Sequence, residues 1–128
     1  MTVVIPADAY ECARAIKSCV DVPGPFYLRV GRGMEPLLHN SEDEFDFEIG
    51  KAMHLKDGND VTIIACGNPT RDALIAGEML DEQGVSAQVI NMHTLKPSEA
   101  YRQITGTTIK TVLKQGCNSG WLRSKKAD

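Results

Sequence analysis

The chain has 128 residues, of which 42% are apolar, and its formal net charge is −3 at pH 7. These totals predict an ordinary globular protein with one domain or parts of two, and the acidic balance argues against non-specific nucleic-acid binding, which needs a basic surface. No apolar run reaches the roughly 18 residues of a membrane span, and no signal-peptide pattern opens the chain. We therefore expect a cytoplasmic protein with neither nucleic acid nor membrane as partner.

The cysteines form no metal-binding pattern. The sequence contains no CxxC pair and no Cys/His cluster, so a zinc site is not expected. We interpret all of them as small apolar core residues: Cys12, Cys19, Cys66 and Cys117.

The first 30 residues predict a β-α-β unit with parallel strands. Residues 2–5 form a short apolar strand that Pro6 ends, Asp8 can cap the following helix, and residues 26–30 form the second strand after a Pro/Gly turn. The helix is expected to bury Ala9, Cys12, Ala13, Ile16 and Val20, and to turn Glu11, Arg14 and Lys17 toward water.

Residues 31–50 read as an exposed connector. They contain glycines, Pro36 and a run of acidic residues, a pattern that usually marks a solvated surface. Alternation of Phe45, Phe47 and Ile49 with acids predicts a short edge strand. Residues 51–55 form another candidate strand, and Asp57-Gly58 after it is a hairpin signal.

Residues 60–97 give the clearest pattern, a strand, a helix and a second strand. Residues 61–65 are apolar and β-branched, Pro69 or Thr70 can open a helix, and residues 85–91 supply the second strand. Gly84 suits the left-handed position that ends a helix. The unit predicts parallel strands, with an apolar helix stripe made of Ala73, Leu74, Ala76, Met79 and Leu80.

Beyond Pro97 the pattern weakens. Ser98-Glu99 can start a helix, and residues 107–113 could form a strand. The last residues, 116–128, combine a glycine-rich stretch with Trp121, Arg123, Lys125 and Lys126.

The amino-acid sequence of these units resembles that of the transketolase family. DVTIIACG, ALIAGEMLDEQG and VSAQVINMHTLKP resemble the C-terminal domain of transketolases, in the form split into N- and C-terminal subunits. MTVVIPAD and FYLRVGR resemble the end of the pyrimidine-binding domain. The resemblance covers residues 1–97 and implies an α/β fold. It divides the chain into the end of the pyrimidine-binding domain (1–38), a linker (39–50) and an incomplete C-terminal domain with a mainly parallel sheet (51–128).

The resemblance also implies that this polypeptide is an internal piece, truncated or frame-shifted at its ends. The family's catalytic carboxylate, its aromatic contacts to the pyrimidine and its reactive-centre histidines would precede Met1. Thiamine diphosphate and a divalent metal (Mg) would bind only in the intact enzyme, with none expected on this chain alone. The implied partners are the N-terminal section, a second copy of the assembly in a heterotetramer-like arrangement, and sugar phosphate substrates.

Arg32 is the one candidate site residue. It follows the strand at residues 26–30, at the edge where open α/β sheets meet ligands, and the resemblance implies contact with the sugar phosphate. The alternative is an ordinary surface arginine, and Arg29 is expected to pack or to pair with an acid. His39, His54 and His93 are interpreted as structural, and the turn at residues 67–70 as a plain turn rather than an anion cradle.

Three interpretations of function follow from the resemblance. The first is a transketolase that transfers two-carbon ketol units between sugar phosphates. The second keeps the same third domain in a deoxyxylulose-phosphate synthase or a 2-oxo acid dehydrogenase β subunit. The third is a non-catalytic α/β module that binds a partner protein. The INMHTLKP motif favours the first.

Overall fold

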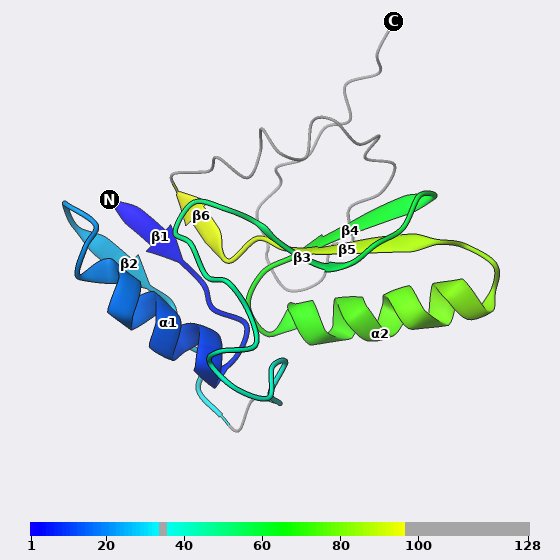
Figure 1. The fold of residues 1–128 in the computed structure, drawn as a ribbon, viewed down its shortest axis with the longest axis horizontal. Helices are drawn as coiled ribbons and strands as arrows, with labels where there is room; N and C mark the ends of the chain where they lie inside the picture. Colours follow the sequence, from blue (N-terminus) through cyan, green and yellow to red (C-terminus); the bar gives the residue numbers. More distant parts are fainter. Residues whose placement is uncertain (34–35, 97–128) are drawn as a thin grey trace, which may run out of the picture.

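A computed structural model describes residues 1–33 and 36–96, which form two α/β units side by side (Figure 1). The first unit contains β1 (Thr2–Val4), α1 (Ala9–Cys19) and β2 (Phe26–Leu28). The second contains β3 (Met53–Lys56), β4 (Val61–Ala65), α2 (Pro69–Glu82) and β5 (Ala87–Asn91). β6 (Thr94–Lys96) follows the second unit. The helix and strand predicted after Pro97 lie outside the described residues.

Each unit has a three-stranded mixed sheet. In the order β2-β1-β6, β1 is parallel to β2 and antiparallel to β6. In the order β3-β5-β4, β5 is parallel to β4 and antiparallel to β3. The two predicted parallel pairs are therefore confirmed, and β6 returns from the second unit to the edge of the first sheet.

The predicted hairpin at Asp57-Gly58 is wrong. β3 does not pair with β4, because β5 lies between them and bonds to both. β5 occupies the centre of the sheet because it is the most buried strand. Its Ala87 and Val89 are fully buried, and Ile63 of β4 packs in the same core. An apolar strand is most stable at the centre of a sheet, where both faces and both edges are covered.

The buried face of α1 differs from the predicted stripe. Asp8 does cap the helix, since its side chain accepts a hydrogen bond from the Glu11 backbone N–H at 2.8 Å. The fully buried residues of α1 are, however, Glu11 and Ala15, whereas Ala9, Ile16 and Val20 are exposed. The prediction for Glu11 is therefore wrong, and the reason is a set of hydrogen-bond donors that reach its carboxylate from distant parts of the chain.

The cysteines of α1 are less buried than predicted. Cys12 and Cys19 are only half-buried, and burial raises the pKa of the Cys12 thiol. Cys66 is half-buried as well, and Cys117 lies outside the described residues.

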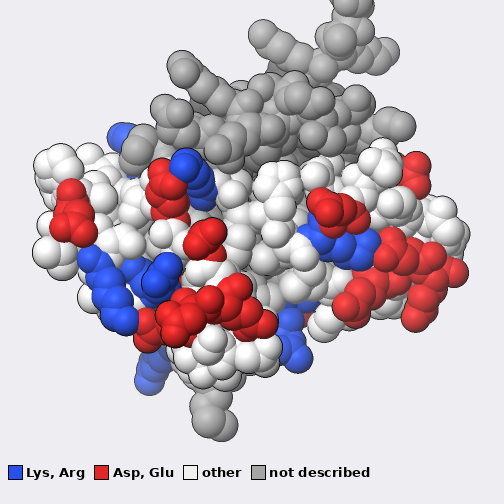
Figure 2. All heavy atoms as spheres, viewed as in Figure 1, with Lys and Arg blue, Asp and Glu red and all other residues white. Residues whose placement is uncertain are grey.

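The described residues of the connector, 31–33 and 36–50, are partly buried and form no strand. Residues 45–49 lack strand hydrogen bonding, so the predicted edge strand is wrong. Phe47 packs instead into the first core with Val4 and Ala15, and its ring stacks on His93 at a centroid distance of 4.1 Å. The acidic side chains themselves are mostly exposed, as predicted. Figure 2 shows them gathered over the connector, with a second group over the C-terminal end of α2.

α2 covers the second sheet through a stripe of small residues. Thr70, Ala73 and Gly77 are its buried positions, and Gly77 lets the helix approach closely, because a Cβ there would stand 3.0 Å from Val89. Gly84 ends this region with φ +79°, as predicted, since glycine adopts this conformation without strain. Met79, predicted to be buried, is exposed because it lies on the face of α2 turned away from the sheet.

Replacing Gly58 by alanine is expected to destabilise the second unit by about 1–3 kcal/mol. A Cβ at Gly58 would lie 2.1 Å from the Ala87 carbonyl carbon and 2.2 Å from the Gln88 nitrogen. Both atoms belong to the central strand, so the loop rather than the strand must move. Urea unfolding measures the loss, with N59A at the exposed neighbouring residue as the control. A G58A midpoint equal to that of the control would contradict the close approach.

Candidate functional site

A network of buried carboxylates joins the two units. The Asp8 side chain, besides capping α1, accepts hydrogen bonds from the backbone N–H groups of Leu38 and His39, both at 2.9 Å. A carboxylate has enough lone pairs for three such donors. The first turn of α1 therefore fixes the connector at residues 38–39.

Glu11 is the centre of this network and is 0% exposed. Its Oε2 accepts a hydrogen bond from the Ala7 N–H at 2.8 Å. Its Oε1 accepts hydrogen bonds from His39 Nε2 at 3.1 Å and from Asn91 Nδ2 at 2.7 Å. Buried carboxylates need such partners, and these come from the helix start, the connector and β5.

α2 supplies two further contacts to the same region. Thr70 Oγ1 donates a hydrogen bond to Asn91 Oδ1 at 3.4 Å. Arg71 Nη1 donates one to the carbonyl oxygen of Leu37 at 2.7 Å. Asp8, Glu11 and Arg71 contact residues 37–39 directly. Thr70 and Asn91 are linked to these residues through Glu11.

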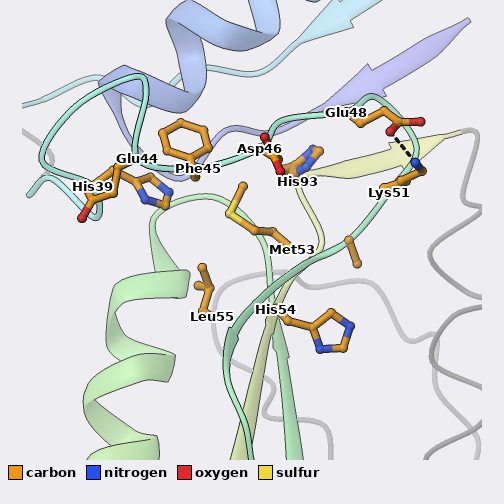
Figure 3. Close-up of a pocket in the computed structure, with 11 residues that line it drawn as sticks. His39, Glu44, Phe45, Asp46, Glu48, Lys51, Met53, His54, Leu55 and His93 are labelled. Atoms are coloured by element: carbon orange, nitrogen blue, oxygen red, sulfur yellow. Dashed lines mark hydrogen bonds and ion pairs between the residues drawn. The ribbon is translucent and has the colours of Figure 1, made fainter.

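A cavity of about 580 Å³ lies beside this network, between the connector and β3 (Figure 3). His39, Phe45, Met53, Leu55 and His93 are among its lining residues. His39 stacks on Phe45 with ring centroids 3.8 Å apart. The charged lining residues are Glu44, Asp46, Glu48 and Lys51, with Glu48 and Lys51 paired to each other.

His93 is buried in the wall of this cavity. It is 1% exposed, stacks on Phe47, and its Nδ1 lies 3.0 Å from Thr94 Oγ1. Burial lowers its pKa from 6.5 to about 4, so the imidazole is neutral at pH 7. A neutral, stacked and hydrogen-bonded ring agrees with the structural interpretation of His93. His39 is buried in the network, and His54 is exposed on β3.

The cavity does not suit a cofactor diphosphate. Its charged lining contains three carboxylates against one lysine, so a diphosphate placed there would be repelled. Among residues 1–33 and 36–96, no group of three or more His, Cys, Asp or Glu side chains is arranged to hold a metal ion.

Arg32 lies outside both the cavity and the carboxylate network. It is exposed after β2, at the strand's C-terminal end, and no described residue forms an ion pair with it. Arg29 is exposed as well and, contrary to prediction, pairs with no acid among the described residues, although its backbone N–H donates to the Val4 carbonyl at 2.9 Å. The turn at residues 67–70 is closed by a hydrogen bond from the Thr70 N–H to the Gly67 carbonyl at 3.0 Å.

Sequence reasoning missed Glu11, Asn91 and the linking role of His39. One signal is present, since Asp8 and Glu11 have the spacing of a capping box, in which the residue at the third helical position reaches back to the chain before the helix. Glu11 does so by accepting from Ala7. The contacts to His39 and Asn91 have no local signal.

No helix in the described part of the chain has the length and apolar character that crossing a bilayer requires.

Comparison with known proteins identifies the class. The family described as the transketolase C-terminal domain matches residues 50–113. A transketolase C-terminal section of Methanocaldococcus jannaschii, named as putative, is 42% identical over 97 residues, covering 76% of this chain and 31% of that protein. One subunit of the apulose-4-phosphate transketolase of Phocaeicola vulgatus is 44% identical with the same coverage, and we call it the apulose-4-phosphate transketolase subunit.

Two further matches bear on the same class. A solved structure titled as a split-gene transketolase, an inactive beta4 tetramer, superposes with a TM-score of 0.79 and 37% identity, covering 88% of this chain and 37% of that one. The 1-deoxy-D-xylulose-5-phosphate synthase of Desulforudis audaxviator is 34% identical over 97 residues, covering 76% of this chain and 15% of that protein. The chain spans about a third of the length of the split-type relatives it matches. It belongs to the transketolase C-terminal domain family.

Proposed function

We propose that this chain acts within a split-type transketolase that transfers two-carbon ketol units between sugar phosphates. The supporting observation is the match over 97 residues to the C-terminal section and to the apulose-4-phosphate transketolase subunit. Residues 50–128 are only 79 residues, so a match of 97 residues must include residues that precede the domain matched by the family.

In this proposal the rest of the assembly would supply the cofactor chemistry. Thiamine diphosphate with Mg²⁺ would provide the carbanion chemistry, and an N-terminal section would hold both, with a second copy completing a heterotetramer-like enzyme. The names of the relatives, a C-terminal section, a transketolase subunit and a tetramer, support this arrangement. The proposed division into residues 1–38, 39–50 and 51–128 is supported by the family match, which begins at residue 50.

An exchange of the matched segment tests this function. Residues 1–97 of this chain would replace the aligned segment of the apulose-4-phosphate transketolase subunit, and the product would be combined with the remainder of that enzyme; we call this the assembled enzyme. Ketol transfer by the assembled enzyme is expected. A folded, fully assembled but inactive product would contradict the proposal.

The isolated 128-residue chain is expected neither to bind thiamine diphosphate tightly nor to transfer ketol groups. The described residues offer a carboxylate-lined cavity rather than an anion site. Isothermal titration with thiamine diphosphate and Mg²⁺ measures this, and micromolar affinity would contradict it.

Arg32→Ala in the assembled enzyme is expected to raise KM for a phosphorylated ketose. Loss of one charge-assisted contact between guanidinium and phosphate costs about 2–3 kcal/mol, or roughly 30- to 150-fold. Arg29→Ala is the matched control, because it removes an exposed arginine from the same strand end. Equal KM values for the two variants would remove Arg32 from the substrate site.

A synthase of the deoxyxylulose-phosphate type is the second candidate, supported by the relative from Desulforudis audaxviator. The product of the assembled enzyme distinguishes the two, because a synthase of this name forms 1-deoxy-D-xylulose 5-phosphate whereas a transketolase transfers a ketol unit between sugar phosphates.

A further inference from the structure

The segment that follows Arg32 is held at three consecutive residues. Arg71 binds the Leu37 carbonyl, Asp8 binds the Leu38 and His39 N–H groups, and Glu11 binds the His39 ring. On the other side of Arg32, the Arg29 N–H is bound to the Val4 carbonyl. These contacts hold the backbone at Arg29, three residues before Arg32, and at residues 37–39, which begin five residues after it.

The second unit also contributes to the contacts that fix residues 37–39. Asn91 of β5 donates to the same Glu11 oxygen that accepts from His39, and Arg71 belongs to the first turn of α2. Glu11, His39 and Asn91 are buried, so their geometry is set by packing and not by solvent. Within the described residues, these contacts connect the second unit to residues 37–39 of the connector, the segment that also contains Arg32.

We propose that Asp8, Glu11 and His39 are positioning residues for Arg32. Through these three residues, the second unit would determine where the Arg32 guanidinium lies relative to the substrate phosphate. This inference rests on the proposed function. An exposed arginine has many rotamers, and fixing the backbone that carries it lowers the entropy lost when it binds an anion. A shift of the chain at residues 37–39 would therefore weaken phosphate binding without touching the reacting atoms.

The experiment measures KM and kcat of the assembled enzyme for a phosphorylated ketose and for the same ketose without its phosphate. His39→Leu keeps an apolar side chain against Phe45 but removes the donor to Glu11. It is expected to raise KM roughly fivefold for the phosphorylated ketose, with KM for the other ketose and both kcat values within about twofold. His39→Gln retains a side-chain N–H donor and is expected to restore most of the difference.

Two further variants make the result decisive. Arg71→Ala removes an exposed hydrogen bond to the Leu37 carbonyl, and it is expected to raise the same KM roughly threefold. His54→Leu, an exposed histidine on β3, is the control and is expected to change neither KM.

The outcomes separate this inference from the role of Arg32 itself. If Arg32→Ala raises the KM for the phosphorylated ketose while His39→Leu and Arg71→Ala leave it unchanged, the inference is overturned and the proposed function stands. If His39→Leu changes both ketoses equally, or lowers only kcat, the network is merely structural and the inference is again overturned. An Arg32→Ala enzyme with unaltered KM would overturn this inference together with the role of Arg32, whereas ketol transfer itself is tested by the exchange of the matched segment.

Discussion

Replacing Glu11 by alanine is expected to lower the free energy of unfolding of the chain by about 3–5 kcal/mol. The carboxylate is 0% exposed and accepts hydrogen bonds from Ala7, His39 and Asn91. Its removal leaves three donors without their acceptor in a region closed to water, and each unmade buried hydrogen bond costs about 1–3 kcal/mol. Since domains are stable by only about 5–15 kcal/mol, the loss is a large share of the total.

Urea unfolding of the full chain, followed by circular dichroism at pH 7, measures this effect. Glu78→Ala is the matched control, because it removes an exposed glutamate from the middle of α2. Glu11→Gln should fall between the control and Glu11→Ala, since an amide keeps one accepting oxygen but turns an N–H toward the existing donors. A Glu11→Ala loss below about 1 kcal/mol would show that the network contributes little.

The elements set by local chemistry can be predicted from the sequence. The β-branched run at residues 61–65, the helix opening at Pro69 and the stop at Gly84 identify the second β-α-β unit with its parallel strands. Asp8 is likewise identified as the cap of α1. Each of these features depends on neighbours within a few residues, which a single sequence displays directly.

The predictions that failed concern contacts distant in sequence. A charged residue on an amphipathic helix usually faces water. Glu11 is buried instead, because it bonds to His39 and Asn91, which lie 28 and 80 residues away in the sequence. The Asp57-Gly58 pair has the composition of a local turn, but insertion of β5 between β3 and β4 is a property of the whole sheet. Phe47 alternates like a strand residue, but its ring is held by His93 from a distant part of the chain.

For the candidate site, the sequence indicates a class of protein and one residue, Arg32. The resemblance to transketolases is confirmed by the family match. The role of Arg32 stays a prediction, because its partner would be a substrate. The contacts of Glu11 with His39 and Asn91 could not be predicted from the sequence, since side chains on separate elements have no shared period along the chain.

His93 is expected to make the stability of the chain fall between pH 7 and pH 4. Burial lowers its pKa from 6.5 to about 4, while in the unfolded chain the pKa returns to about 6.5. Between these values the unfolded state binds more protons than the native state, so the free energy of unfolding decreases as the pH falls. Over the whole interval the contribution of His93 is on the order of 3 kcal/mol, and above pH 7 it no longer varies.

Other groups also titrate in acid, so the difference between variants is the informative quantity. His93→Gln cannot titrate, and wild type should lose about 3 kcal/mol relative to it between pH 7 and pH 4 in urea titrations. His54→Gln, which replaces an exposed histidine on β3, is the control and should follow wild type closely. If the wild-type and His93→Gln stabilities stayed parallel across this range, the imidazole would have to protonate inside the folded protein. The stacked contact with Phe47 would then have to open toward the carboxylate-lined cavity, where a charged ring could be stabilised.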